Sequence, residues 1–362
     1  MRSPNCTRPS KWLFQSKRPW PKTGSRLQSP DGYRACTGRQ PVTAYTQLLL
    51  SPSLYDALSQ FYQRFAAQTR ECIRCELRYA PSLAKKPVSI SSSEVPSHTV
   101  DPFAPPYIPE LLISQSEDSE GEEGYVVLLN KFCVVPRHFL LVTKEYKSQK
   151  TPPTPEDLVA IYVLLQQALV SDPTSEWLAF YNCGPNSGAS FQFIPAQAGE
   201  NKFGELIARS APAKLGEFEC DVYNVKELGY AHFICAIPSC LSSKPDDEET
   251  EATLGTYFMT MLDSMIDHLR HLASEENSPH TRPKELSYNF LMTSKYMILI
   301  PRSRECLLSN GLSINSLGVG AGMVLVKNQA ELDEARRLGI DELLEGVTFP
   351  KLKDVINPCD HG

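Results

Sequence analysis

The spacing of apolar residues along the chain predicts helices interspersed with pairs of strands. Apolar residues recur every three or four positions, as in helices, in residues 51–68, 154–169, 253–272 and 332–344. Other apolar segments are short and bounded by turn residues, as strands are: residues 125–135, 138–143, 177–181, 191–196, 224–238 and 287–302. Most of these strands follow one another across short turns. The pattern therefore predicts an α+β fold, an antiparallel sheet with packing helices, rather than a doubly wound parallel sheet.

Capping and turn residues mark several element ends. Thr154 is followed by proline and two acids, which predicts the first turn of a helix. Residues 294–295 separate two apolar segments and predict a hairpin turn. The acidic run at 244–251 is predicted to be a solvated loop ahead of the next helix. The glycines of residues 313–327, SINSLGVGAGMVLVK, predict a tight turn between a helix and a strand.

Composition and charge indicate a globular protein and argue against nucleic-acid binding and against a membrane-spanning segment. The 362 residues are 41% hydrophobic and 22% charged, which is typical of a globular protein. A net charge of -6 argues against nonspecific nucleic-acid binding, and no apolar run approaches the roughly 20 residues that span a bilayer. We therefore expect neither nucleic acid nor membrane as a partner, and a cytoplasmic or also nuclear location with reduced thiols. Cys72 and Cys75 form a CxxC pair with no second pair nearby, so no metal site is expected.

The chain divides into three parts by composition. Residues 1–45 are basic and proline-rich without hydrophobic periodicity, which predicts a disordered extension. Its charge is typical of a mitochondrial transit peptide, but its prolines interrupt the amphipathic helix that such a peptide needs. An upstream extension that is not translated is the favoured alternative. Two regions follow, residues 46–200 and residues 201–362.

Candidate chemistry concentrates in residues 177–197, WLAFYNCGPNSGASFQFIPAQ. Two apolar strands flank a turn of small and polar residues. Gly184 and Gly188 suit a turn that lets a ligand approach the backbone, and successive amides with the Ser187 and Ser190 hydroxyls can cradle a phosphate. An ordinary hairpin loop is the alternative that spacing alone leaves open.

At this loop the sequence resembles a known family. FYNCGPNSGAS followed by QFIPA resembles the active-site strand pair of fungal ATP adenylyltransferases, the diadenosine tetraphosphate phosphorylases of the histidine-triad-like superfamily. Residues 128–146, LLNKFCVVPRHFLLVTKEY, and residues 313–327 resemble the same family. The resemblance implies a histidine-triad-like nucleotidyltransferase architecture. It also implies phosphorolysis of diadenosine tetraphosphate to ATP and ADP through an adenylyl-histidine intermediate.

The chain departs from the family at the nucleophile. The family has Gln-Pro-His-Lys-His-Leu ahead of Gln-Phe-Ile-Pro, and the second histidine attacks the phosphorus. Here Ser190 is followed by Phe191 and Gln192, so the His-x-His is missing and no catalytic residue is assigned. Two explanations compete: an active enzyme whose sequence has lost this segment, or a catalytically inactive nucleotide-binding relative. A uridylyltransferase-type sugar enzyme, from a related branch of the superfamily, fits the loop less well.

The resemblance also implies which residues bind nucleotide. They are Lys86 (or its neighbour Lys85), Asn130, Lys131, Asn182, Gly188, Ala189, Ser190, Gln192, Asn289, Thr293 and Met297. His138 is expected to be structural rather than catalytic, and His232 to be a core imidazole. The implied partners are diadenosine polyphosphate, ATP, ADP and phosphate. No cofactor is assigned, although a divalent cation that accompanies the nucleotide stays open.

Overall fold

The protein is described by a computed structural model. It describes residues 63–68, 74–85, 103–116, 124–130, 134, 138–171, 173, 176–187, 194–197, 220–274, 285–307 and 311–352. The strands are β1 Gln63–Gln68, β2 Arg74–Tyr79, β3 Leu112–Gln115, β4 Tyr125–Leu129, β5 Phe139–Thr143, β6 Trp177–Cys183, β7 Ile194–Gln197, β8 Phe233–Ala236, β9 Tyr288–Met292, β10 Tyr296–Pro301 and β11 Met323–Val326. The helices are α3 Pro155–Ser171, α5 Glu248–Ser274, α6 Ser316–Ala321, α7 Gln329–Leu338 and α8 Ile340–Glu345, with short 3-10 helices at Pro81–Lys85 and Ser239–Ser243.

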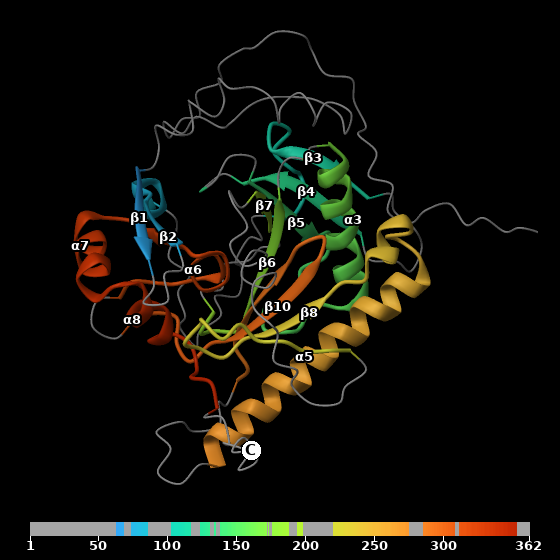
Figure 1. Ribbon diagram of the computed structural model, residues 1–362. Helices are drawn as coiled ribbons and strands as arrows, with labels where there is room; N and C mark the ends of the chain where they lie inside the picture. The colour runs from blue at the N-terminus through green and yellow to red at the C-terminus, as the bar shows by residue number, and fades with distance from the viewer. Residues whose placement is uncertain are drawn as a thin grey trace, which may run out of the picture.

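An antiparallel sheet forms the centre of the molecule. Its strands lie in the order β7-β6-β9-β10-β8, and a second antiparallel sheet, β3-β4-β5, adjoins it where β5 lies beside β7. Helices α3 and α5 pack against each other and cover one face (Figure 1). This arrangement confirms the predicted α+β class, an antiparallel sheet with packing helices. Among the described helices, none is long and apolar enough to cross a membrane.

The other face of the sheet is covered by the carboxy-terminal elements. Helix α6 packs on β6 and β9, and it leads through Gly322, at φ 66°, into β11. The tight helix–strand turn predicted for residues 313–327 is therefore confirmed. Strand β11 pairs in parallel with β2, so the small sheet β1-β2-β11 is mixed. That one parallel pair is a feature that the sequence pattern did not predict.

Alternation along the strands divides the core between the two faces. In β9, Phe290 and Met292 belong to the core under α3 and α5, whereas Leu291 belongs to the core under α6. Side chains of successive strand residues point to opposite faces, so one apolar segment supplies both cores. Strands β9 and β10 pair from Met292↔Met297 to Tyr288↔Pro301, which confirms the turn predicted at residues 294–295.

The start of α3 follows its predicted capping chemistry. The Thr154 hydroxyl accepts a hydrogen bond from the Asp157 amide at 3.3 Å, and the Asp157 carboxylate accepts one from the Thr154 amide at 2.8 Å. This reciprocal pair satisfies two of the amides that a helix start leaves without partners. The start of α5, by contrast, lies inside the acidic run predicted to be a loop. Asp247 accepts from the Thr250 amide, and the acids that follow stabilise the first turn through the helix dipole.

Three other boundary predictions were wrong. The end of the helix predicted at 51–68 is strand β1, because its backbone pairs with β2 along its whole length; residues 51–62 lie outside the described residues. The helix predicted at 332–344 is two helices, separated by Gly339 at φ 84°. Residues 224–238 were predicted to form a pair of strands, but β8 pairs with the distant strand β10 instead. On its other edge, Ile234 of β8 forms an isolated β-bridge with Tyr223.

His232 is a core imidazole, as predicted. Its Nε2 accepts from the Val225 amide at 2.6 Å, and its Nδ1 lies 2.8 Å from the Tyr230 carbonyl oxygen. Burial lowers the pKa of His232 to about 3, from 6.5 for a solvated histidine. The neutral imidazole therefore fits this site, since the protonated ring would lose its acceptor nitrogen.

This burial predicts a pH dependence of folding. Below pH 6.5 the unfolded chain binds a proton at His232 that the folded chain does not, so stability present above 6.5 is lost as the pH falls toward 3. By pH 5 the loss is about 2 kcal/mol. Urea unfolding should show that His232→Gln flattens this part of the pH profile. The exposed His271→Gln serves as control, and an unchanged slope in His232→Gln would contradict the assignment.

Candidate functional site

The loop that follows β6 is closed by its own backbone and by two neighbouring segments. Gly184 has φ 80°, and a side chain there would lie 2.3 Å from the Leu286 carbonyl oxygen, so the close approach requires glycine. The Gly184 amide donates to the Gln149 carbonyl at 2.9 Å, and the Asn186 amide donates to the Ser287 hydroxyl at 3.2 Å. These contacts fix the turn between the sheet and the residues predicted to hold phosphate.

The Ser187 hydroxyl was expected to face a phosphate, and the structure places it differently. Ser187 is fully buried, and its hydroxyl donates to the Gly184 carbonyl at 2.7 Å. The hydroxyl thus closes the turn from inside. Ser187 can therefore affect anion binding through the conformation of the loop, and its hydroxyl does not donate to the anion itself.

Asn182 is oriented by three donors on a single atom. Its Oδ1 accepts from the Asn289 side-chain amide at 2.8 Å, from the Ser316 hydroxyl at 2.5 Å and from the Ser316 amide at 3.2 Å. The side-chain NH₂ group of Asn182 therefore points away from this cluster, and no acceptor for it is found among the described residues. An amide whose carbonyl is held and whose NH₂ group is unused is a preorganised donor for an anion.

Asn289 lies next to Asn182, and both its side-chain nitrogen and its side-chain oxygen form hydrogen bonds within the protein. One amide nitrogen donates to Asn182 and, at 2.9 Å, to the Ser187 carbonyl, while its Oδ1 accepts from Arg302 at 2.5 Å. It has no exposed surface. A direct contact between Asn289 and nucleotide stays a prediction. Through its hydrogen bonds, Asn289 positions the Asn182 side chain and the loop at Ser187.

Arg302 joins this network to the rest of the fold. Its guanidinium is buried, and its acceptors among the described residues are neutral oxygens: the Asn289 side chain and the carbonyls of Ser187, Arg304, Glu305, Ile314 and Val347. Burial lowers the pKa of Arg302 to about 9, which leaves the group charged at neutral pH. Arg302 was not among the residues predicted from the sequence, although its place directly after the apolar strand β10 was an available signal.

Asn130 directly follows β4 in the second antiparallel sheet and is buried. Its Nδ2 lies 3.1 Å from His138 Nε2, and the Val134 amide lies 3.4 Å from His138 Nδ1. Both ring nitrogens of His138 therefore hold the turn between β4 and β5. This geometry agrees with the structural role expected of His138, and Asn130 is the neighbour that it orients.

Thr293 and Met297 are not brought to Asn182. Thr293 Oγ1 accepts from the amides of Lys295 and Tyr296, which closes the hairpin turn. Met297 is fully buried in the core beneath α5, on the opposite face from Asn289. Its predicted contact with nucleotide does not agree with this position, because β10 alternation turns the side chain away from the loop.

The other residues predicted to bind nucleotide lie, as whole residues or by their side chains, outside the part of the chain that the structure describes: Lys85, Lys86, Lys131, Gly188, Ala189, Ser190 and Gln192. The extension at residues 1–45 lies outside it too. Cys75 is buried in β2, while Cys72 is not described. Among the described residues, no group of three or more His, Cys, Asp or Glu side chains is placed to hold a metal ion.

Comparisons with known proteins show related sequences along most of the chain. Two family models match: the Ap4A phosphorylase N-terminal domain over residues 50–198, and the ATP adenylyltransferase C-terminal domain over residues 226–350. Diadenosine 5′,5‴-P1,P4-tetraphosphate phosphorylase 2 of Saccharomyces cerevisiae is 34% identical over 268 residues, which is 70% of this chain and 77% of the relative. Protein APA1 of the same yeast is 28% identical and covers 74% of this chain and 81% of its own.

Solved structures give the same result. Yeast Ap4A phosphorylase Apa2 in complex with Ap4A has a TM-score of 0.61 and 29% identity, over 81% of this chain and 91% of that one. The fold is the histidine-triad-like architecture of nucleotidyltransferases. The chain belongs to the ATP adenylyltransferase family, that of the Ap4A phosphorylases, which confirms the resemblance found in the sequence.

The Arg302 network predicts a large loss of stability on substitution. Arg302→Met removes the donors for several buried oxygens, and we expect the free energy of unfolding to fall by roughly 3–5 kcal/mol. Arg304→Met is the matched control, because Arg304 is exposed and contributes only its carbonyl to the network. Urea denaturation of both variants measures the difference. Equal losses would show that the buried guanidinium has no special role.

Proposed function

We propose that this chain binds adenine nucleotides of the diadenosine tetraphosphate reaction at the loop after β6 and, as written, does not transfer an adenylyl group. The orientation of Asn182 is the observation that supports nucleotide binding. Three donors hold its Oδ1, so its NH₂ group is fixed in place before any ligand arrives. Fixed donors stabilise phosphate oxygens without the cost of reorganisation.

The family supplies the class of ligand. Solved structures of Apa2 contain Ap4A in one case and AMP in another. In this chain Asn182 continues into the residues predicted to hold phosphate, Gly188, Ala189, Ser190 and Gln192. Diadenosine polyphosphate, ATP, ADP and phosphate are thus the proposed partners, and a divalent cation that accompanies the polyphosphate is compatible with the proposal.

The absence of the nucleophile supports the other part of the proposal, that the chain does not transfer an adenylyl group. The sequence has no histidine between His138 and His232, and these two rings are committed to backbone groups of the fold. Adenylyl transfer through a covalent intermediate needs an attacking nitrogen that becomes bonded to the α-phosphorus while the leaving nucleotide departs. Binding groups alone hold the substrate but do not form that bond.

A second candidate function is the family's full reaction in a longer form of this chain. The family sequence continues on both sides of the Ser190–Gln192 junction, and the hydrogen-bond network behind the loop is complete in the described residues. If the natural protein includes the histidine segment, this scaffold is an active phosphorylase. The two candidates differ only at that junction.

Nucleotide binding is tested by Asn182→Asp. The new carboxylate keeps an oxygen for Asn289 and Ser316 but replaces the NH₂ donor with a negative charge. Calorimetry should show that the unaltered chain binds ATP and that this variant binds it at least about tenfold more weakly. Asn328→Asp introduces the same charge at the exposed cap of α7 and should bind ATP normally. Equal affinities in the two variants, or no binding to the unaltered chain, would reject the proposed site.

The missing nucleophile is tested by insertion. The unaltered chain should release no ATP or ADP from diadenosine tetraphosphate and phosphate. Replacing Phe191 with Gln-Pro-His-Lys-His-Leu should raise turnover by a factor on the order of 10⁶, the typical contribution of a covalent nucleophile. The control insertion, Gln-Pro-His-Lys-Ala-Leu, restores length without the nucleophile and should stay inactive. Turnover by the unaltered chain would show that another group performs the attack.

A further inference from the structure

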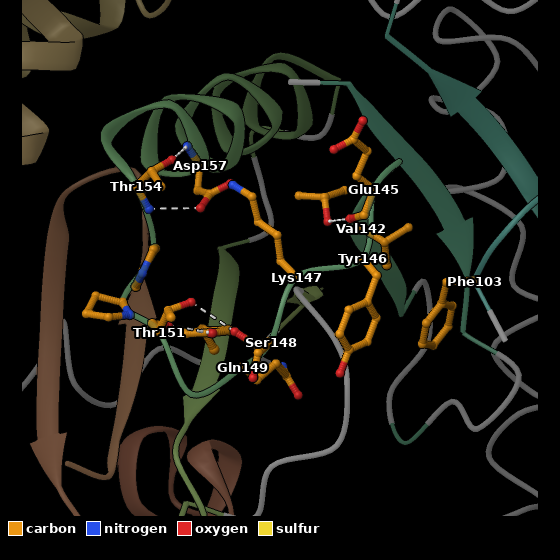
Figure 2. Close-up of a pocket in the computed structure, with 14 residues that line it drawn as sticks. Phe103, Val142, Glu145, Tyr146, Lys147, Ser148, Gln149, Thr151, Thr154 and Asp157 are labelled. Atoms are coloured by element: carbon orange, nitrogen blue, oxygen red, sulfur yellow. Dashed lines mark hydrogen bonds between the residues drawn. The ribbon is translucent and has the colours of Figure 1, made fainter. Parts of the chain in front are cut away.

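A cavity of about 370 Å³ lies at the end of β5, where it is bounded by the connection to α3 and by Tyr181 of β6 (Figure 2). Its wall is joined to the loop after β6, because the Tyr181 hydroxyl donates to the Thr151 carbonyl and the Gly184 amide donates to the Gln149 carbonyl, each at 2.9 Å. The cavity therefore adjoins the site already described. A second feature, which the proposed function does not use, lies at the opposite edge of the central sheet, beneath α5.

Two cysteine thiols meet in the core under α5. Cys235 lies in the edge strand β8 and has no exposed surface, whereas Cys220 precedes the segment that bridges to β8 and is 7% exposed. Their sulfur atoms are in direct contact at 3.2 Å, and both residues are in the thiol form. The sulfur atoms of a disulfide are about 2.05 Å apart, so bond formation here needs a relative movement of about 1 Å.

The local pairing explains why the two sulfur atoms meet. Tyr223 and Ile234 form an isolated antiparallel bridge, in which each amide donates to the carbonyl of the other residue, at 2.8 and 3.0 Å. Val222 is therefore opposite Cys235 on the face beneath α5, and Cys220 points to that same face as the diagonal neighbour of Cys235. Diagonal side chains in a regular ladder stand too far apart for a disulfide, and the bend in the chain at Cys220 accounts for the closer approach here.

The surroundings of the two thiols indicate the order in which they would react with an oxidant. Cys220 is followed by the exposed Asp221, so a small oxidant reaches Cys220 before the enclosed Cys235. The hydrogen bond with Cys220 and burial both raise the pKa of Cys235, which keeps it a thiol and a poor first nucleophile. Contact with Cys220 supplies the proximity that a second, intramolecular step needs.

We propose that Cys220 and Cys235 form a reversible disulfide when the protein meets hydrogen peroxide. The Cys220 thiol loses its proton and its sulfur attacks one peroxide oxygen; the O–O bond breaks, and the other oxygen leaves as water, so that Cys220 becomes a sulfenic acid. The Cys235 sulfur then attacks the Cys220 sulfur, the S–O bond breaks, and the hydroxyl leaves as water with the Cys235 proton. The two thiols lose two electrons, and the peroxide is reduced to two water molecules.

The disulfide would strengthen one edge of the central sheet. Strand β8 pairs with β10 on one side, and on its other side the pairing is the single bridge from Ile234 to Tyr223. The two cysteines are 15 positions apart, so the new bond closes a loop that includes this bridge. A crosslink restricts the unfolded chain more than the folded one, and the oxidised protein is therefore the more stable form.

The test compares the full chain after treatment with hydrogen peroxide and after reduction with dithiothreitol. Remaining thiols are alkylated in denaturant, and mass spectrometry of the peptides should show Cys220 linked to Cys235 in the oxidised sample and both alkylated in the reduced one. Thermal unfolding should give a Tm that is higher in the oxidised sample by on the order of 5 °C. Dithiothreitol added to the oxidised protein should reverse both changes.

Three variants separate this disulfide from other oxidation. Cys220→Ala and Cys235→Ala should each lose the linked peptide and the rise in Tm; each variant is compared with its own reduced form, so lower stability alone cannot imitate this result. Cys240→Ala removes an exposed cysteine of the nearby 3-10 helix and should keep both. The proposal is overturned if both thiols remain alkylatable after peroxide treatment, if either is linked to another cysteine instead, if Cys220 ends as a sulfinic acid, or if the linked protein has an unchanged Tm.

Discussion

The buried guanidinium of Arg302 is the interaction on which the rest of the site depends. A charge in the interior is costly unless its hydrogens all find acceptors, and here carbonyl groups from several segments converge on it. Because these carbonyl groups and the Asn289 side chain all accept hydrogen bonds from Arg302, the segments that carry them are fixed relative to Asn289. Asn289 in turn fixes Asn182 and the Ser187 carbonyl. The start of the loop after β6, as far as Ser187, is therefore held in position by one cation buried at the end of β10.

The central sheet divides its side chains between two cores by simple alternation. On β6, Tyr181 faces the core under α3 while Phe180 and Asn182 face the carboxy-terminal elements. The same alternation places the polar network of Asn182, Asn289 and Ser316 on the face that the carboxy-terminal elements cover. Helices α3 and α5 cover the face to which Trp177, Ala179 and Tyr181 point.

The parts of the fold that were predictable are those that local residues determine. The cap at Thr154 and the hairpin turn at 294–295 follow from neighbours in sequence. Strand β1 was missed because its conformation depends on pairing with β2, and tertiary pairing overrides helical spacing. The network was not predictable, since Arg302 and the Ser187 carbonyl it contacts are 115 positions apart. Asn182 was identified through family resemblance, whereas the reason for its orientation required the three-dimensional contacts.

The register of β6 and β7 shows which residues keep their places when the chain changes length at the Ser190–Gln192 junction. The two strands pair from Trp177↔Gln197 to Phe180↔Ile194, and the missing family segment falls between Ser190 and Gln192, beyond the last of these pairs. A change of length there leaves the paired residues on their proper faces, whereas a slip of one residue within the ladder would reverse them. Packing, capping and the Arg302 network all lie outside the junction. The proposed binding groups and the nucleophile of the family therefore belong to different stretches of the chain, and a change in one leaves the packing around the other in place.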